Sequence, residues 1–436
     1  MKNSVALLKY KQSPDSLREA IALCDGFSGL KPAARILIKP NLVMWDNNLP
    51  ISPFGVFTTT RLVEDLVLLL QEAGCTDITI GDGSMTAKPG SSTADAFVGL
   101  GYESLVTKYH VKLVDFNKSP GLKLRDAWGY EMQVAKEVLD TNFLINMPVL
   151  KTHGQTKVSL GIKNLKGCLK MSSKRLCHDP ARGGLEHAFS VLPDLVKPAL
   201  TIIDGIYALE QGPLVSGKAI RKNVVIVSKD ILGADLVAAK SIGYDPEDIL
   251  HFKELAHRTG KSLDLNNYQV KGEKLENHIT PLKWDWPWTK DDIGPLAFER
   301  AGIHNVEAPK YDETVCSGCS LTSYVVNMLV LSAVQGKPAP VSLPRIEILN
   351  GKKRQARAGY DATVLIGNCI AKANAQNPHI RKALKVTGCP PEYLDIVETL
   401  RGAGLDVKDN AYVDALHQQY VRYEGKPEFS WRFFGK

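Results

Sequence analysis

The chain has 436 residues, of which 44% are hydrophobic and 23% are charged. This length exceeds what one hydrophobic core usually organises, so we expect two domains, and the composition argues against intrinsic disorder. The formal net charge of +7 is a mild excess of positive charge, which suits a small anionic ligand. The chain has no zinc-finger, homeodomain or RNA-binding motif, which argues against nucleic acid as a partner.

The amino-terminal residues show no targeting or membrane segment. The apolar stretch from Val5 to Leu8 is interrupted by Lys9 and Lys11, so it is too short for a signal peptide or a membrane span. Eight cysteines without an export signal indicate the reducing cytosol, where clustered thiols bind metal more often than they form disulfides. We therefore predict a cytoplasmic protein without a membrane partner.

The first half of the chain alternates strand and helix signals. The amphipathic stretch from Thr60 to Ala73, which ends at Gly74, predicts a helix. Strands separated by helices predict an α/β fold with a mostly parallel sheet that helices cover on both faces. The predicted strands are Arg35 to Ile38, Asp77 to Ile80, Phe143 to Asn146, Leu200 to Ile203 and Val224 to Val227.

The pattern weakens after about residue 245. Prolines and charges are scattered there, and Trp284, Trp286 and Trp288 stand close together, which we interpret as an irregular segment anchored by its aromatic side chains. Regular signals return near residue 311. We predict a substrate domain over 1–245, a connecting segment over 246–310 and a second, smaller α/β domain over 311–436. The predicted elements of the second domain are helices at Leu321 to Val334 and Pro391 to Arg401, and strands at Arg345 to Leu349 and Ala362 to Ile366.

Four cysteines of the second domain form a candidate metal site. Cys316 and Cys319 make a CxxC pair, whereas Cys369 and Cys389 lie in the segments Gly367-Asn368-Cys369 and Gly388-Cys389, which follow strands or precede helices. Such loops collect ligands in α/β sheets, and glycine lets backbone N–H groups approach inorganic sulfide. The sequence predicts a [4Fe–4S] cluster on these thiolates. The alternatives are a structural zinc ion, or buried thiols with no metal.

The segment Gly388-Cys389-Pro390-Pro391 resembles the cluster-ligand segment in the small subunits of NADH–quinone oxidoreductase and nickel–iron hydrogenases. The resemblance implies that Cys389 is a cluster ligand. We also expect the two prolines to begin a helix, whose positive end would favour the thiolate form of Cys389.

Polar, glycine-containing segments follow the predicted strands of the first domain. In their order they resemble the motifs of the DUF362 family, whose members often carry an attached iron–sulfur module. The resemblance extends over about residues 30 to 245 and implies the two-part architecture without implying a reaction. The matching segments are Ile38 to Leu42, Gly81-Asp82-Gly83, Asn146 to His153, Gly161 to Cys168, and Ile203-Asp204-Gly205 leading to Gln211-Gly212-Pro213.

These segments also contain the candidate active site, because the loops that follow parallel strands meet at one edge of a sheet. Lys163 and Lys166 share a face if their segment is helical, and that face could clamp a carboxylate or phosphate. His153 is favoured over His178 and His187 as a general acid or base. The predicted catalytic residues are His153, Lys151 and Asp204, and the predicted substrate-binding residues are Lys39, Asn41, Asp82, Lys163, Asn164 and Lys166.

The leading functional hypothesis is an iron–sulfur oxidoreductase. Its cluster would exchange electrons with a carrier protein such as ferredoxin and deliver them to a small anionic substrate. One alternative is a non-redox lyase, isomerase or hydrolase with a structural cluster or zinc, in which His153 and Lys151 transfer protons. Another is an electron-carrier or binding module without catalysis. No GxGxxG motif or P-loop supports a dinucleotide or ATP site, and the oligomeric state is left open.

Overall fold

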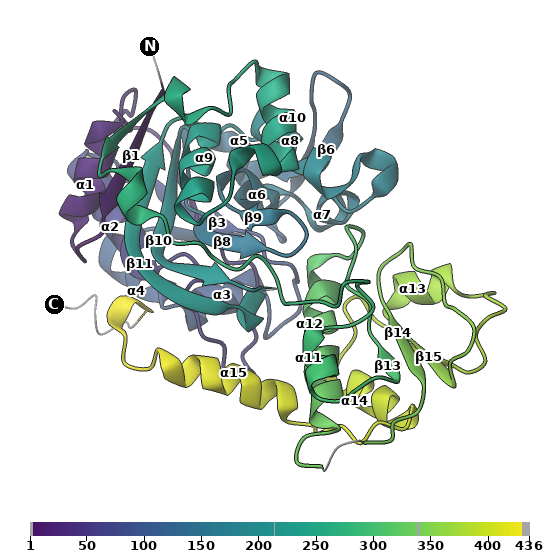
Figure 1. The fold of residues 1–436 in the computed structure, drawn as a ribbon. Coiled ribbons are helices and arrows are strands. Elements are labelled where there is room, and N and C mark those ends of the chain that lie inside the picture. The colour runs from purple at the N-terminus through teal and green to yellow at the C-terminus, as the bar shows by residue number, and fades with distance from the viewer. Residues whose placement is uncertain (1–2, 213, 338–340, 430–436) are drawn as a thin grey trace. The chain divides into compact units, whose positions relative to one another are not determined.

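The computed structural model describes residues 3–212, 214–337 and 341–429, so Pro213 of the last family motif lies outside the described residues. The chain forms two compact units, one comprising Met1–Trp284 with Gln419–Lys436 and the other Asp285–Gln418 (Figure 1). The division after Trp284 lies between the predicted boundaries at 245 and 310. Residues 246–284, expected to be irregular, contain helix α10 (Leu250–Thr259) and edge strand β12 (Tyr268–Gly272).

A ten-stranded sheet among the described residues organises the first unit, in the order β12-β1-β11-β10-β7-β2-β3-β4, with β8 paired to β10 and β9 to β8. Strands β10, β7, β2, β3 and β4 are parallel neighbours, whereas β11 runs antiparallel to β1 and β10. The mostly parallel sheet is thus confirmed. Besides β12 its strands are β1 (Asn3–Lys9), β2 (Ile36–Lys39), β3 (Ile78–Asp82), β4 (Lys112–Asp115), β7 (Phe143–Asn146), β8 (Val149–His153), β9 (Lys157–Ser159), β10 (Leu200–Glu210) and β11 (Lys218–Ser228).

Helices cover both faces of this sheet (Figure 1). Val5 and Leu7 of β1 join the core that α8, α9 and α10 form, while the alternate residues Ala6 and Leu8 are buried toward the opposite face. Helix α1 packs on β1 and on α2. The helices of this unit are α1 (Pro14–Leu23), α2 (Thr60–Glu72), α3 (Thr93–Gly99), α4 (Tyr102–Tyr109), α5 (Lys136–Asp140), α6 (Gly161–Asn164), α7 (Met171–Leu176), α8 (Gly184–Leu195), α9 (Ile231–Ser241) and α10; a hairpin of β5 (Gly121–Arg125) and β6 (Glu131–Ala135) accompanies them.

The second unit contains a separate sheet in which β13 to β16 are parallel and follow chain order. Trp286 packs edge-on against Tyr324 at a ring-centroid distance of 4.5 Å, and Trp288 packs against Tyr311 at 6.1 Å, which agrees with their interpretation as anchors. The elements are β13 (Val306–Glu307), β14 (Ile346–Leu349), β15 (Ala362–Ile366), β16 (Ala383–Val386), α11 (Leu296–Arg300), α12 (Ser317–Ser332), α13 (Asn368–Ala373), α14 (Tyr393–Gly402), and α15 (Ala411–Arg422), which continues into the first unit.

Candidate active site

A buried ion pair lies where β2 and β3 end. Lys39 and Asp82 are the last residues of these parallel strands, and Lys39 Nζ is 2.6 Å from Asp82 Oδ1. Lys39 Nζ also donates to Asn164 Oδ1 at 3.2 Å, and the two oxygens of Asp82 accept the backbone N–H groups of Leu42 and Gly83. Both side chains are at most 2% exposed. These hydrogen bonds compensate the free energy that is needed to remove both charged groups from water.

Asparagine side chains extend this network along the same edge of the sheet. Asn146 ends β7 opposite Lys39, and Asn164 in α6 donates to Asn146 Oδ1 at 2.8 Å. Asn146 in turn donates to the carbonyl of Gly161, and the carboxylate of Asp235 accepts the backbone N–H of Gly161 at the start of α6. The start of α6 is therefore fixed against the strand ends, which positions Asn164 beside Lys39.

More lysines surround the ion pair. Lys174 of α7 donates to the carbonyls of Gly83 and Ser84 and to Asn117 Oδ1, at 2.7 to 3.2 Å. Among the described residues Lys151 of β8 donates to the carbonyl of Val56 at 3.2 Å, and Lys163 of α6 donates to the hydroxyl of Ser159 at 3.3 Å. Lys174 did not figure in the sequence prediction.

The pKa values of these lysines are depressed. Burial, reinforced by the charge of Lys39, lowers the pKa of Lys151 to about 7, and burial lowers that of Lys174 to about 7 as well. The pKa of Lys163 falls well below its ordinary value because of burial and the charges of Lys151, Lys166 and Lys39. Desolvation and like charges therefore act together on one group of amines. We call Lys39, Asp82, Lys151, Lys163, Lys166 and Lys174 the lysine cluster.

Two histidines adjoin the lysine cluster. The half-buried His153 accepts the backbone N–H of Thr156 at Nδ1, at 3.3 Å, which leaves the proton of the neutral ring on Nε2. Burial and the charges of Lys163 and Lys166 hold the pKa of His153 well below its usual range. His178 Nε2 lies 2.7 Å from Lys166 Nζ. The imidazole of His153 can therefore act as a neutral hydrogen-bonding group beside the amines.

Glycine is required where the backbone meets the ion pair. A Cβ at Gly167 would overlap Asp82 Oδ1 and come within 2.6 Å of Lys39 Nζ. We expect Gly167→Ala to lower the free energy of unfolding by about 1–3 kcal/mol, the usual effect of overpacking, and to disturb the ion pair. Chemical denaturation measures this loss. Gly402→Ala is the control, since nothing lies within 4 Å of its added Cβ; equal stability of both variants would contradict the prediction.

Other predicted residues have different surroundings. The carboxylate of Asp204 accepts the backbone N–H groups of Thr59, at 2.6 Å, and Ile206, and burial raises its pKa to about 6. Asp204 thus stands at the amino-terminal end of α2, within β10, instead of after a strand. Asn41 donates to the carbonyl of Val56 at 2.7 Å, the same carbonyl that Lys151 contacts. It therefore supports the loop beside Lys151.

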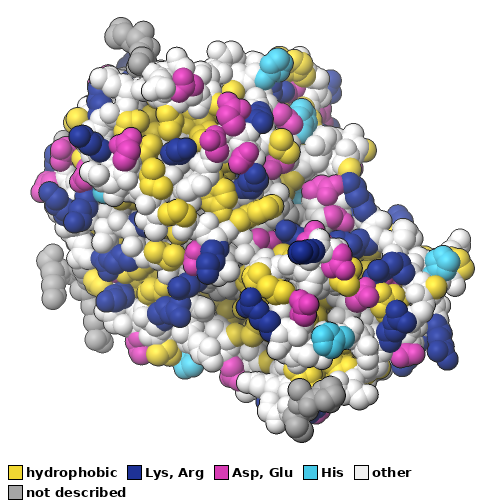
Figure 2. All heavy atoms as spheres, viewed as in Figure 1, with side chains coloured by type: hydrophobic (Ala, Val, Ile, Leu, Met, Phe, Trp, Pro, Cys, Tyr) yellow, Lys and Arg dark blue, Asp and Glu magenta, His cyan; other side chains and the backbone are white. Residues whose placement is uncertain are grey.

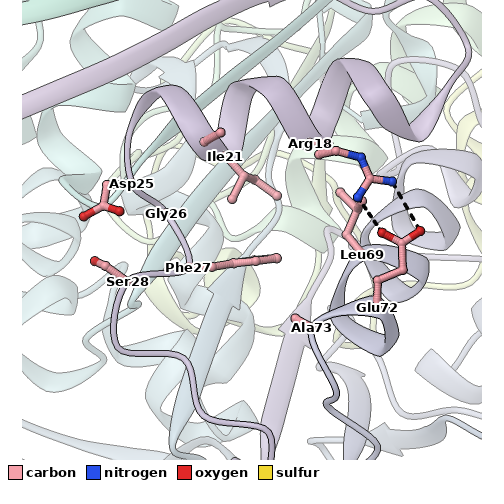
Figure 3. A pocket seen from close by; sticks show the side chains of 10 residues that line it. Arg18, Ile21, Asp25, Gly26, Phe27, Ser28, Leu69, Glu72 and Ala73 are labelled. Carbon is pink, nitrogen blue, oxygen red and sulfur yellow. Dashed lines mark hydrogen bonds and ion pairs between the residues drawn. The ribbon is translucent and has the colours of Figure 1, made fainter.

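Two pockets lie apart from the lysine cluster. His187 pairs with Glu254 at 3.0 Å and lines a pocket of about 280 Å³ with Arg182. A pocket of about 570 Å³ has apolar walls that include Phe27 and Leu69 (Figure 3). Neither is lined by a residue of the lysine cluster. On the face seen in Figure 2, Lys and Arg side chains are interspersed with acidic and hydrophobic ones.

The four predicted cluster ligands lie in the second unit. Cys316 precedes the first residue of α12, Cys319 lies in its first turn, and Cys369 lies in the first turn of α13. A hydrogen bond with Cys316, burial, and the charges of Cys316, Cys389 and Cys369 raise the pKa of Cys319. The four thiols are therefore within electrostatic range of one another. Among the residues described, no three His, Cys, Asp or Glu side chains are grouped as a single metal ion would need.

One expectation about Cys389 is wrong. Helix α14 begins at Tyr393 and is preceded by Glu392, so Pro390 and Pro391 lie before the helix and do not begin it. A strand-like bridge between Gly388 and Pro391 occupies this segment instead. Helix amino termini, which favour thiolates, lie at the other three cysteines.

The comparisons with known proteins agree with the sequence motifs. Residues 36–240 match the family described as Domain of unknown function (DUF362). The chain is 29% identical over 259 residues to the thylakoid-associated protein sll1697 of Synechocystis sp., a match that covers 57% of this chain and 77% of that protein. A solved structure, the lactate racemase apoprotein from Thermoanaerobacterium thermosaccharolyticum, matches 54% of this chain and 57% of its own length, with 14% identity and a TM-score of 0.35.

The matched region includes the segments that build the lysine cluster. It begins at the first residue of β2, contains Asp82, Lys151 and Lys163, and ends in α9. The residues that build the lysine cluster therefore lie within the segment that matches the DUF362 family, as the motifs predicted.

Proposed function

We propose that the segment matching the DUF362 family forms a catalytic domain that binds a small anionic substrate at its lysine cluster. The observation that carries this proposal is the grouping of several buried lysines around one carboxylate, Asp82, which already pairs with Lys39. Cations removed from water need a compensating anion. A carboxylate or phosphate beside Lys151, Lys163 and Lys166 would supply that charge and restore the ordinary pKa values of Lys151 and Lys163.

The same groups can move protons. A pKa of about 7 leaves Lys151 able to accept or donate a proton at neutral pH, which suits a general base or acid. His153 would offer its Nε2 hydrogen to a developing negative charge. This pairing favours the alternative function of a non-redox lyase, isomerase or hydrolase. A module without catalysis would instead keep its function in Lys151→Ala and His153→Ala variants.

For the second unit we propose a [4Fe–4S] cluster held by Cys316, Cys319, Cys369 and Cys389. The donors fit such a cluster, since all four cysteines are free thiols. A Cβ at Gly367 would come within 3.4 Å of Cys319 Sγ, so the glycine leaves space beside this sulfur atom. When bound, such a cluster supplies single electrons.

Anaerobic reconstitution of the full chain tests the cluster. We expect iron and sulfide to bind in the ratio of a [4Fe–4S] centre, with an EPR signal on reduction, and Cys319→Ser to lose most of both. Cys24→Ser is the control, because Cys24 is buried in the first unit. Wild-type protein that binds one zinc ion per chain and no iron would contradict the proposal.

The partner and the location are proposals as well. An electron carrier such as ferredoxin would exchange electrons with the cluster, and we propose that the protein works in the cytoplasm. In the described part of the chain, no helix is long and apolar enough to cross a membrane. The name of the Synechocystis relative associates that protein with thylakoids, so fractionation of the native cells decides the location of this one.

A further inference from the structure

The amines of the lysine cluster differ in how many hydrogen-bond acceptors they have. Lys39 Nζ has three, Asp82, the carbonyl of Pro40 and Asn164, and Lys174 Nζ also has three. Three acceptors match the three hydrogens of an ammonium group and fix it in place. Lys151 Nζ has one acceptor among the described residues, the carbonyl of Val56 at 3.2 Å. Lys163 Nζ also has one such acceptor, the hydroxyl of Ser159 at 3.3 Å, but Lys151 is the more deeply buried of the two lysines. The amine of Lys151 therefore combines a single hydrogen bond with nearly complete removal from water.

The surroundings of Lys151 are those of an activated amine. Lys151 is 6% exposed, and the titratable groups that face it are Lys39 from β2, Asp82 from β3, Lys163 from α6 and His153 from its own strand. The carboxylate is already engaged by Lys39, so the nearby positive charge is not fully cancelled. A lysine that is desolvated beside a second cation is converted from a solvated ammonium into a nucleophile.

We propose that Lys151 forms an imine with a small carbonyl compound that carries a carboxylate or phosphate group. This inference rests on the proposed anion-binding function and deepens it, because it names the substrate class. The neutral Nζ attacks the carbonyl carbon and loses its two protons, and the carbonyl oxygen leaves as water after it gains two protons in exchange. The C=O bond is thereby replaced by a C=N bond, with no change in oxidation state. The anionic group lies on Lys163 and Lys166.

His153 is a positioning residue and proton donor in this scheme. Its Nδ1 is occupied by the backbone N–H of Thr156, so Nε2 carries the hydrogen that can assist the departure of water. The indole of Trp284 donates to the carbonyl of His153 at 2.7 Å, which fixes the backbone at that point. An imine in this setting would withdraw electrons from the adjacent carbon and ease removal of its proton.

Reductive trapping of the full-length protein tests the imine. Pyruvate serves as the probe at pH 7 with cyanoborohydride, and peptide mass spectrometry locates the resulting carboxyethyl group. We expect Lys151 to be labelled about a thousandfold faster than an exposed lysine, because its neutral fraction at pH 7 is larger by about that factor. Lys151→Arg keeps the charge and should lose this label, whereas Lys123→Arg, at an exposed position, should keep it.

Sulfate binding, measured by calorimetry on the same samples, separates the two proposals. Sulfate binding by wild type and by Lys151→Arg, with labelling only in wild type, supports both. Two results overturn the imine but not the anion site. The first is sulfate binding by wild type without a label on Lys151. The second is a label on another residue of the lysine cluster in the Lys151→Arg variant. Wild-type protein that binds neither sulfate nor pyruvate overturns both.

Discussion

Replacement of Asp82 by Asn should destabilise the protein by about 3–5 kcal/mol, the usual effect of breaking a buried ion pair. Asp82 compensates the charge of Lys39 at 2.6 Å, and it also lies near Lys174. The variant would leave buried ammonium groups without a carboxylate. An amide also has one acceptor oxygen, so the N–H groups of Leu42 and Gly83 would no longer both be satisfied. Urea or guanidinium unfolding of purified protein measures the loss.

Asp77→Asn is the matched control. Asp77 pairs with Lys112 at 2.8 Å, but the side chains are 41% and 68% exposed, so this loss should be below about 1 kcal/mol. Replacement of both Lys39 and Asp82 by Met and Asn should recover part of the stability, since the uncompensated charge of Lys39 is removed as well. Similar losses for Asp82→Asn and Asp77→Asn would refute the compact, desolvated site described here.

Anion affinity should fall as pH rises above about 7. In the free protein Lys151 and Lys174 have pKa values of about 7, and a bound anion would raise the pKa of the lysine it contacts. Below pH 7 both states are protonated and affinity is constant. Above pH 7 the free protein loses protons that the complex keeps, so affinity falls by up to about tenfold per pH unit for each lysine involved.

Sulfate is the appropriate ligand for this measurement, since its charge does not change in this range. Calorimetry in buffers with different ionisation enthalpies should show proton uptake at pH 8 and almost none at pH 6. Lys163→Met should weaken binding at every pH, whereas Lys123→Met should not, because Lys123 is exposed and lies on the hairpin strand β5. Binding that is independent of pH from 6 to 9 would argue against lysines with depressed pKa values.

Most of the candidate site could be predicted because strand ends are visible in the sequence. Short apolar runs locate β2, β3 and β7, and parallel pairing brings Lys39, Asp82 and Asn146 to one edge. The identity of the carboxylate that pairs with Lys39 could not be predicted, because it depends on register and side-chain direction. Lys174 was missed for the same reason: it follows no strand, and a helix brings it back to Gly83.

Asp204 shows where the same reasoning fails. The apolar run from Leu200 to Ile203 was expected to end the strand, yet β10 continues to Glu210 with every residue buried. A carboxylate can lie within this strand because the N–H groups of Thr59 and Ile206 satisfy it. Tertiary partners of this kind leave no local signal. Its predicted catalytic role stays a prediction, as do the roles of the four cysteines.

The location of a bound anion tests the central claim most directly. Crystals of the full chain soaked in tungstate, a scatterer with the shape and charge of sulfate, can be examined by anomalous diffraction. We predict a peak in contact with Lys163 Nζ and Lys151 Nζ, beside the Lys39–Asp82 pair, and its loss in Lys163→Met crystals. Tungstate bound only at other positions, with the lysine cluster empty in the same crystals, would contradict the assignment of this cluster as the substrate site.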